Sequence, residues 1–259
     1  MIHAENITVL AGRKRLLDGV DAHIAPGRVT ALIGPNGAGK STLISVLSGE
    51  RRPDGGHVML DGLPMASWPA LALARRRAVL LQSASLDFAF TVAEVVELGR
   101  LPFAGTEAQI DDKRAIAAAC RLAGIDAFRA HSYQTLSGGE KQRVQFARAL
   151  AQLWRRDGAG GEMRYLLLDE PTSALDLRHQ RSVLEAARAL ASDGVGILAA
   201  LHDLNLAAAY ADDVILMSCG RIAAAGAIDD VMTGETLGAC FEVPVEILVR
   251  ENGARAILT

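Results

Sequence analysis

The sequence predicts an α/β fold with a parallel sheet at its core, a flanking antiparallel β-subdomain and an inserted helical subdomain. Short apolar runs that end in polar or acidic residues recur along the 259-residue chain, as is typical of buried parallel strands. Strands bounded by turns fill residues 1–30 and 55–62, whereas the pattern from about 83 to 150 is mostly helical. Because each motif described below occurs once, we expect residues 1–259 to form a single domain.

A glycine-rich loop joins the first buried strand to a helix. The run Val29–Ile33 is apolar and Lys40–Leu47 has a helical pattern. The connection fits G-x-x-x-x-G-K-[ST] and comprises Gly34, Pro35, Asn36, Gly37, Ala38, Gly39, Lys40, Ser41 and Thr42. Its glycines let backbone N–H groups converge on phosphate oxygens, and the helix start adds positive potential. We expect Lys40 to bind the β- and γ-phosphates and Ser41 to coordinate Mg²⁺, roles that a turn serving only as a helix cap would not require.

A second helix start has the character of a phosphate site. It comprises Ser137, Gly138, Gly139 and Glu140. Ser137 is a typical N-cap, and the two glycines leave the first helical N–H groups open to an anion to which the Ser137 hydroxyl can also donate. Alone, the segment is equally typical of an ordinary capping box.

Two carboxylates follow a third apolar run. Residues Tyr165–Leu168 predict a buried parallel strand that delivers Asp169 and Glu170 at its carboxyl end, where Pro171 turns the chain away. Asp169 is suited to hold Mg²⁺, through water, and Glu170 to act as the general base on an attacking water.

Two more polar residues are expected at the same sheet edge. His202 follows the apolar run 195–201, and Gln82 follows the run 78–81. His202 could reach a terminal phosphate and the Glu170 carboxylate, although a lone histidine after a strand is more often structural. The Gln82 amide could bind Mg²⁺ or hold the water. The sequence therefore suggests Glu170, His202 and Gln82 as catalytic residues, and Ser41, Gln82 and Asp169 as metal ligands.

Composition limits the classes of function. The net charge of −3 argues against nucleic acid as a partner. No apolar stretch approaches the ~20 residues of a membrane span, and three dispersed cysteines indicate reduced thiols. The six histidines form no ligand cluster, so we expect no haem site on this chain. The basic runs 51–52, 75–77 and 155–156 are either solvated surface or contacts with another subunit or anionic lipid.

In this order, the motifs resemble those of the nucleotide-binding subunit of ABC transporters over essentially the whole chain. The resemblance implies ATP and Mg²⁺ as ligands and adds a loop that crosses to a partner subunit, formed by Ser173, Ala174, Leu175 and Asp176. In that family, residues equivalent to 137–140 of one protomer cover the ATP held by the other. The resemblance thus implies a head-to-tail homodimer on the cytoplasmic face of the inner membrane, a transmembrane permease dimer and an extracytoplasmic substrate-binding protein.

One position departs from the family pattern. Most members place an aromatic ring on adenine ahead of the phosphate loop, and we align Ala11 with that ring. Phosphate and Mg²⁺ contacts would then supply most of the affinity, which predicts loose base selectivity.

The helical subdomain resembles that of a narrower group. Segment 90–100 resembles the corresponding segment of the ATPases that serve importers of large iron chelates, haem and cobalamin. The loop 154–164 and the run 80–85 are most similar to those of the haem-importing members. Siderophore and cobalamin importers remain alternatives, because Phe103 stands where histidine is frequent. ABC ATPases of DNA repair or ribosomes usually have two nucleotide domains or a coiled-coil insertion, and this sequence has neither.

Overall fold

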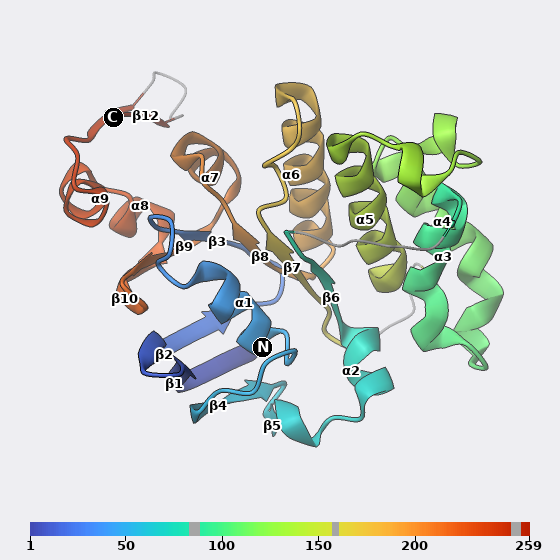
Figure 1. Cartoon of the computed structure of the whole chain (residues 1–259), viewed down its shortest axis with the longest axis horizontal. Coiled ribbons are helices and arrows are strands. Elements are labelled where there is room, and N and C mark those ends of the chain that lie inside the picture. Colours follow the sequence, from blue (N-terminus) through green and yellow to red (C-terminus); the bar gives the residue numbers. More distant parts are fainter. Residues whose placement is uncertain (83–88, 157–160, 250–254) are drawn as a thin grey trace.

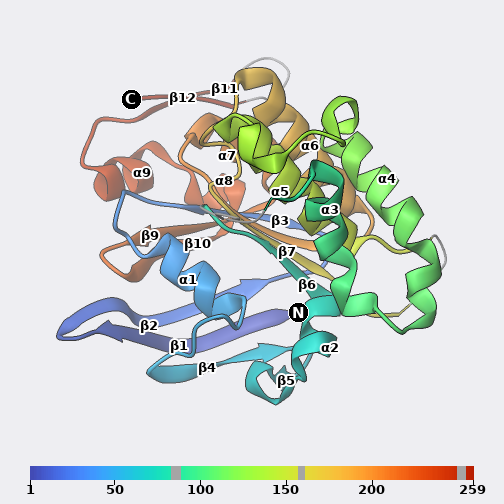
Figure 2. The ribbon, with the colours of Figure 1, turned by 45° about the vertical axis from the view of Figure 1, so that its right-hand side comes forward.

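The computed structural model describes residues 1–82, 89–156, 161–249 and 255–259 (Figure 1). Parts of two segments considered above, 83–88 and 157–160, lie outside the described residues. The described chain forms a mixed α/β molecule whose central sheet lies between helices and a second, antiparallel sheet (Figure 2).

Six strands form the central sheet, and five of them are parallel. In spatial order they are β10 (Arg221–Ala227), β9 (Asp213–Ser218), β3 (Val29–Ile33), β8 (Gly196–Ala200), β7 (Tyr165–Asp169) and β6 (Arg77–Leu80). The apolar runs identified in the sequence form β3, β6, β7 and β8, whose carboxyl ends meet at one sheet edge. Only β10 is antiparallel, through a hairpin with β9 that turns at Cys219 and Gly220.

The antiparallel sheet packs beneath the central one in the view of Figure 2. Its strands are β2 (Lys14–Ile24), β1 (Ile2–Ala11), β4 (Gly55–Leu60) and β5 (Leu63–Pro64). The short strands expected over residues 1–30 are instead two long ones, because β-bulges interrupt the register without ending the β1–β2 pairing. A small ribbon of β11 (Glu246–Val249) and β12 (Arg255–Leu258) lies near the C-terminus.

Alternate residues of the central strands face two different cores. Ala31, Leu166 and Ile197 belong to the core shared with the helices of the opposite layer, whereas Leu32 and Leu167 belong to the core shared with α1 (Lys40–Leu47) and the antiparallel sheet. Strands buried on both faces read as continuous apolar runs, which explains the pattern in the sequence. The central sheet is thus packed on both of its faces.

The predicted helical subdomain is present in the described residues between 89 and 153. It comprises α3 (Val92–Glu97), a 3₁₀ segment (Leu98–Phe103), α4 (Asp112–Leu122) and α5 (Gly138–Leu153). A Cβ on Gly99 would lie 2.3 Å from the Arg148 carbonyl oxygen, so the 3₁₀ segment rests directly on the backbone of α5. Arg100, which is 3% exposed, bonds Asp112 at 2.8 Å and the Ala151 carbonyl at 2.8 Å.

The remaining helices cover the central sheet or connect its strands. They are α2 (Ala70–Arg76), α6 (Leu177–Ser192), α7 (Leu204–Tyr210), α8 (Ile228–Val231) and α9 (Gly234–Phe241), with short 3₁₀ turns at Met65–Ser67, Glu107–Asp111, Asp126–Phe128 and Tyr133–Thr135. Within the described residues, no helix combines the length and apolar character that a bilayer crossing requires.

The basic run 75–77 is bound within the chain. Arg75 donates to the Pro102 carbonyl at 2.7 Å, and Arg76 stacks 4.3 Å from the centre of the Trp68 ring while pairing with Asp61 at 3.0 Å. Arg75 and Arg76 are therefore not plain solvated surface. They help to join α2 and β6 to the rest of the molecule.

Candidate nucleotide-binding site

The glycine-rich loop leaves β3 in a backbone conformation that side chains rarely adopt. Gly34 has φ of 147° and Gly39 has φ of 104°. A Cβ on Gly34 would lie 2.2 Å from the Met217 carbonyl oxygen, and one on Gly39 would lie 2.9 Å from Leu17 Cδ2. The loop is therefore pressed between β2 and β9, and α1 begins immediately behind it at Lys40.

Lys40 lies inside this loop. Its ammonium donates to the Gly34 carbonyl at 2.7 Å and to the Pro35 carbonyl at 3.2 Å, and the residue is only 6% exposed. Burial lowers the pKa of Lys40, and the nearby carboxylates of Glu170 and Asp169 oppose that shift. The loop thus encloses a poorly solvated positive charge that a phosphate group would stabilise.

The predicted Mg²⁺ ligands Ser41 and Asp169 lie together. The Ser41 hydroxyl, from the first turn of α1, donates to Asp169 Oδ1 at 3.1 Å across from the end of β7. Burial raises the pKa of Asp169, the Glu170 carboxylate adds to the rise, and the Ser41 hydrogen bond opposes it.

Glu170 is the meeting point of the three predicted catalytic side chains. Its Oε1 lies 2.6 Å from His202 Nε2, and its Oε2 accepts a hydrogen bond from Gln82 at 2.7 Å. Glu170 also has φ of 51°, in the left-handed region that residues with side chains avoid. The strained turn after β7 directs this carboxylate between the ends of β6 and β8.

Gln142 belongs to this constellation and was not singled out in the sequence. Its Nε2 donates to the Glu170 carbonyl at 2.8 Å, and its Oε1 accepts from the Ala174 N–H at 3.2 Å. A glutamine inside a helical run carries no local signal of such a role. The only hint in the sequence is that Gln142 lies two residues after Glu140, which is in the first turn of α5.

The second glycine-containing helix start is a capping box at the beginning of α5. The Ser137 hydroxyl accepts from the Glu140 N–H at 3.3 Å, and its own proton is directed to Glu140 Oε2 at 2.7 Å. Bonds from the Ser137 hydroxyl and N–H lower the pKa of Glu140. In this structure the Ser137 hydroxyl thus donates to Glu140, whereas the sequence suggested an anion as its acceptor.

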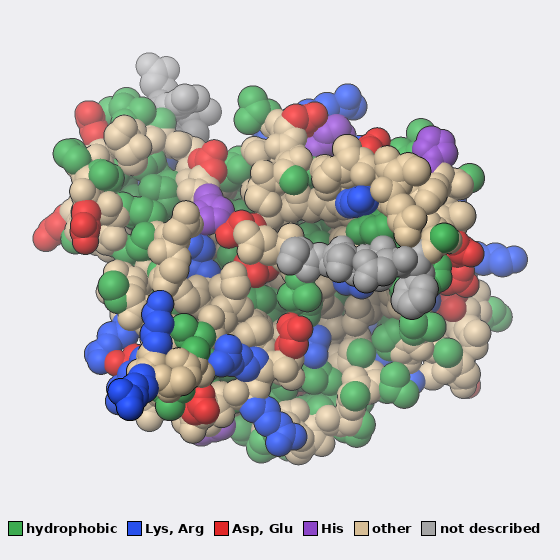
Figure 3. Space-filling model, in the orientation of Figure 1, with side chains coloured by type: hydrophobic (Ala, Val, Ile, Leu, Met, Phe, Trp, Pro, Cys, Tyr) green, Lys and Arg blue, Asp and Glu red, His purple; other side chains and the backbone are tan. Residues whose placement is uncertain are grey.

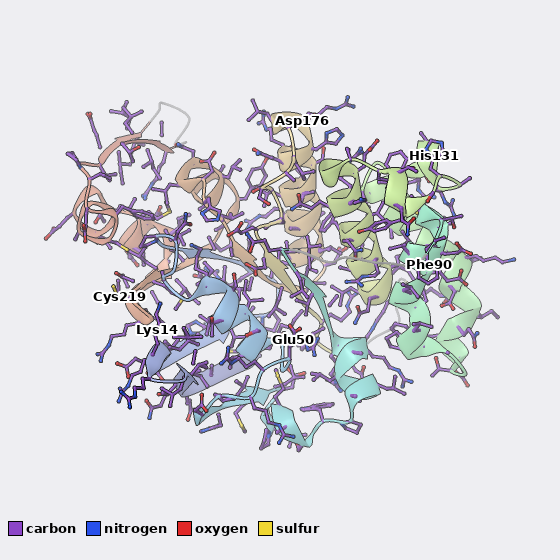
Figure 4. The ribbon with its side chains drawn as sticks, in the orientation of Figure 1. Lys14, Glu50, Phe90, His131, Asp176 and Cys219 are labelled. Atoms are coloured by element: carbon purple, nitrogen blue, oxygen red, sulfur yellow. The ribbon has the colours of Figure 1, made fainter. Side chains whose placement is uncertain are left out.

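The loop Ser173, Ala174, Leu175 and Asp176 runs from Glu170 to α6. The Ser173 N–H donates to the Glu170 carbonyl at 3.3 Å, and Asp176 caps α6 by accepting from the His179 N–H at 2.9 Å. A Cβ on Gly139 would lie 2.7 Å from the Ala174 carbonyl oxygen, so this loop contacts the start of α5. Asp176 projects at the outer end of α6 (Figure 4).

A cavity of about 510 Å³ opens over the glycine-rich loop. It is lined by Lys14, Arg15, Leu16, Asn36, Gly37, Gly39, Lys40, Ser41, Thr42, Glu170, Cys219 and Gly220. Lys14 and Cys219 mark its outer rim in Figure 4, and Lys and Arg side chains gather around that region in Figure 3. Among these lining residues, none is aromatic and none comes from residues 137–140.

Comparison with known proteins identifies the family. The family model "ABC transporter" matches residues 17–173, which include the glycine-rich loop, the start of α5 and both carboxylates. The chain is 48% identical to a protein named hemin import ATP-binding protein HmuV of Agrobacterium fabrum, across 94% of this chain and 92% of that protein. A protein of the same name from Pseudomonas fluorescens is 47% identical across 98% of this chain and 97% of its own length.

Solved structures agree with the sequence relatives. An ATP-binding subunit of an ABC transporter superposes with a TM-score of 0.78 at 25% identity, covering 93% of this chain and 94% of that one. A dimeric bacterial ABC transporter cassette superposes with a TM-score of 0.76 at 26% identity, covering 88% and 99%. Since the family model spans more than half of the chain and contains the whole glycine-rich loop, this chain belongs to the ABC transporter family, as one of its ATP-hydrolysing subunits.

Proposed function

We propose that this chain powers the import of haem through a separate transmembrane permease dimer. The observation that carries the proposal is the identity of 44–48% to relatives named as hemin import ATPases, each matched over nearly all of this chain. Recognition of the haem itself is assigned to the other subunits. Among the described residues, no group of three or more His, Cys, Asp or Glu side chains is placed to hold a metal ion.

ATP binds in the cavity over the glycine-rich loop in this proposal. Lys40 and the backbone N–H groups of the glycine-rich loop, to which Pro35 contributes none, neutralise and orient the β- and γ-phosphates. Ser41, Asp169 and Gln82 would hold Mg²⁺, and the adjacent oxygens of Ser41 and Asp169 fit that ion, which usually takes one or two carboxylates together with substrate phosphates. When bound, Mg²⁺ neutralises charge on the phosphate oxygens.

Glu170 is the proposed general base. His202 and Gln82 each bind a different oxygen of its carboxylate, which orients the group while leaving further lone pairs for a water molecule. The carboxylate takes a proton from the attacking water as the bond from the water oxygen to the γ-phosphorus forms, while the bond from the γ-phosphorus to the β–γ bridging oxygen breaks and ADP leaves. In this proposal His202 and Gln82 position the base, and His202 also reaches the terminal phosphate.

The proposed assembly is a head-to-tail homodimer in which residues 137–140 of one protomer cover the nucleotide of the other. The loop from Ser173 to Asp176 would cross between the protomers. Two features support this arrangement: residues 137–140 do not line the cavity of their own chain, and a solved relative is dimeric. The dimer would sit on the cytoplasmic face of the inner membrane, beneath the permease and its extracytoplasmic binding protein.

Growth and uptake in cells that lack the gene test the cargo. We expect loss of growth on haem as the sole iron source, with ferric-siderophore and cobalamin uptake intact. Restoration by the native gene but not by Lys40→Ala would tie the loss to ATP binding. Loss of siderophore or cobalamin uptake instead would overturn the haem assignment.

A further inference from the structure

A separate cavity of about 510 Å³ opens between the end of α1, the antiparallel sheet and α2, and we call it the α1–α2 pocket. Of its surrounding elements, β4, β5 and α2 lie at the lower edge of the view in Figure 1. Among the described residues, none lines both this pocket and the nucleotide cavity. The proposed mechanism of ATP hydrolysis therefore makes no use of it.

Much of the wall of the α1–α2 pocket is apolar. Four of the side chains that line it are buried hydrophobic ones, namely Val46, Val58, Met65 and Leu73. Sites for small molecules usually enclose about 300–1,000 Å³ and place a few polar groups among apolar walls. The pocket has both the size and the walls of such a site.

The charged side chains that line the pocket are basic. Arg51 and Arg52 follow the end of α1, and Arg77 begins β6. His57 also lines the pocket, and its Nε2 lies 3.3 Å from the Glu5 carboxylate. Among the described lining residues there is no Asp or Glu, so the pocket wall supplies no counter-charge for its three arginines.

Two hydrogen-bond donors in this wall lack acceptors. The Nε1 of Trp68 and the Nε of Arg77 are buried and make no hydrogen bond. Burial lowers the pKa of Arg77 and the Glu50 carboxylate opposes that shift, but the guanidinium cannot lose its proton in a protein. Buried donors without acceptors are costly, as is a poorly solvated charge. The chain itself leaves this part of the pocket without an anionic acceptor.

The apolar walls and the positive charge together limit what the pocket can bind. An inorganic anion would pair with the arginines but leave the apolar walls in contact with water. A neutral apolar molecule would cover those walls but would leave the arginines without an anion. A molecule with an apolar body and an anionic head matches both parts of the pocket.

We propose that the α1–α2 pocket binds an amphipathic anion, whose apolar body lies against the buried walls and whose head pairs with Arg52 and Arg77. Arginine binds carboxylates and phosphates with the same fork of N–H groups, so fatty acids and lipid phosphates are two sources of this chemistry. The inference goes beyond the proposed function, since it requires neither haem nor the permease.

Calorimetric titration of the full-length chain with dodecanoate and with dodecyl phosphate, each below the concentration at which it forms micelles, tests the site. We expect saturable binding of one molecule per chain, and the tighter of the two probes identifies the head group. Dodecanol lacks the charge and acetate lacks the apolar body, so each should bind at least about tenfold more weakly. No saturable binding of either probe, or equally tight binding of dodecanol, would overturn the inference.

Two variants then locate the bound probe. Arg77→Met removes the poorly solvated charge, and Ala70→Trp fills the pocket from the exposed start of α2 without changing a charge. Each should weaken the tighter probe at least about tenfold. Arg121→Met, at an exposed arginine on α4 outside the pocket, is the matched control and should keep the native affinity.

A thermal midpoint close to the native one shows that each variant is folded, and Ala70→Trp decides alone if Arg77→Met does not fold. Native affinity in the folded pocket variants would overturn the inference. Haem uptake in cells bears only on the proposed function, so the two proposals fail separately.

Discussion

At the scale of single residues, the proposed mechanism assigns ATP binding and ATP hydrolysis to different side chains. The buried ammonium of Lys40 would neutralise phosphate charge, whereas the Glu170 carboxylate contacts His202 and Gln82. We expect Lys40→Ala to abolish ATP binding. Glu170→Gln should bind ATP normally and hydrolyse it at least about a hundredfold more slowly, because an amide cannot take the proton. Titration with a fluorescent ATP analogue and phosphate release check the two effects, and normal turnover by Glu170→Gln would refute the base assignment.

We predict loose base selectivity, because Ala11 stands where an aromatic ring would stack on adenine. Ala11 is exposed at the end of β1, and the residues that line the nucleotide cavity include no aromatic side chain. We expect GTP to compete with ATP within roughly tenfold, and Ala11→Tyr to tighten ATP by about 1–3 kcal/mol, the range for stacking a base on an aromatic ring. Competition binding measures both quantities. A strong preference of the native chain for ATP would mean that other residues recognise adenine.

The site is also a source of instability. Burial raises the pKa of Asp169 in the folded chain above its ordinary value of 3.8, so the folded state binds this proton more tightly than the unfolded chain. The free energy of unfolding therefore falls as pH rises through the interval between the two values, and it stays reduced at pH 7. We expect Asp169→Asn to raise the thermal midpoint at pH 7 but not below both pKa values, while ATP hydrolysis is lost. A lower midpoint at pH 7 would contradict this sign.

At the scale of elements, two adjacent glycines at the start of α5 separate folding from assembly. A Cβ on Gly139 would press on the Ala174 carbonyl oxygen at 2.7 Å, whereas one on Gly138 would meet nothing within 4 Å. We expect Gly139→Ala to destabilise the isolated chain by about 1–3 kcal/mol. Gly138→Ala, the matched control, should leave its stability unchanged or slightly higher, because alanine favours helix. Denaturant unfolding of both variants measures the difference.

Gly138→Ala is expected to affect ATP hydrolysis, although it should not affect stability. Its open position is where the nucleotide of the partner protomer would lie, so Gly138→Ala should impair ATP hydrolysis although the chain folds normally. Equal loss of stability in the two variants would show that the contact with Ala174 does not constrain α5.

The sequence predicts the buried elements of this fold well. Residues Val29–Ile33 and Lys40–Leu47 have the bounds expected of them, because a strand buried on both faces is a continuous apolar run and the glycines mark where it ends. For the same reason, the residues that follow four parallel strands could be expected at one edge. Glu170, His202 and Gln82 do meet there.

Other contacts depend on tertiary structure and have no local signal. The charge of residues 75–77 suggests an outer surface, yet Arg76 finds Trp68 and Asp61 only once α2 is folded against the antiparallel sheet. Gln142 acquires its role only because α5 begins beside the turn after β7. The β-bulges of β1 likewise hide the length of that strand, since they break the alternation that predicts it.

At the scale of the whole molecule, the proposed dimer divides each site between two chains. Lys40→Ala damages the phosphate loop, and Ser137→Arg would damage the segment that covers the partner's nucleotide. Either variant alone should be inactive, because both sites of its homodimer carry the same defect. In a heterodimer of the two, one site carries both defects and the other carries none.

Mixing the two inactive variants therefore tests head-to-tail assembly directly. At equal amounts, about half of the dimers are mixed and each has one intact site, so we expect up to about a quarter of the native ATPase activity to return. Lys40→Ala mixed with Glu170→Gln is the control: both changes damage the same half of a site, so every site keeps a defect and the mixture should stay inactive. If Lys40→Ala and Ser137→Arg also failed to complement while still forming mixed dimers, residues 137–140 would have to act within their own chain, and the composite site would be wrong.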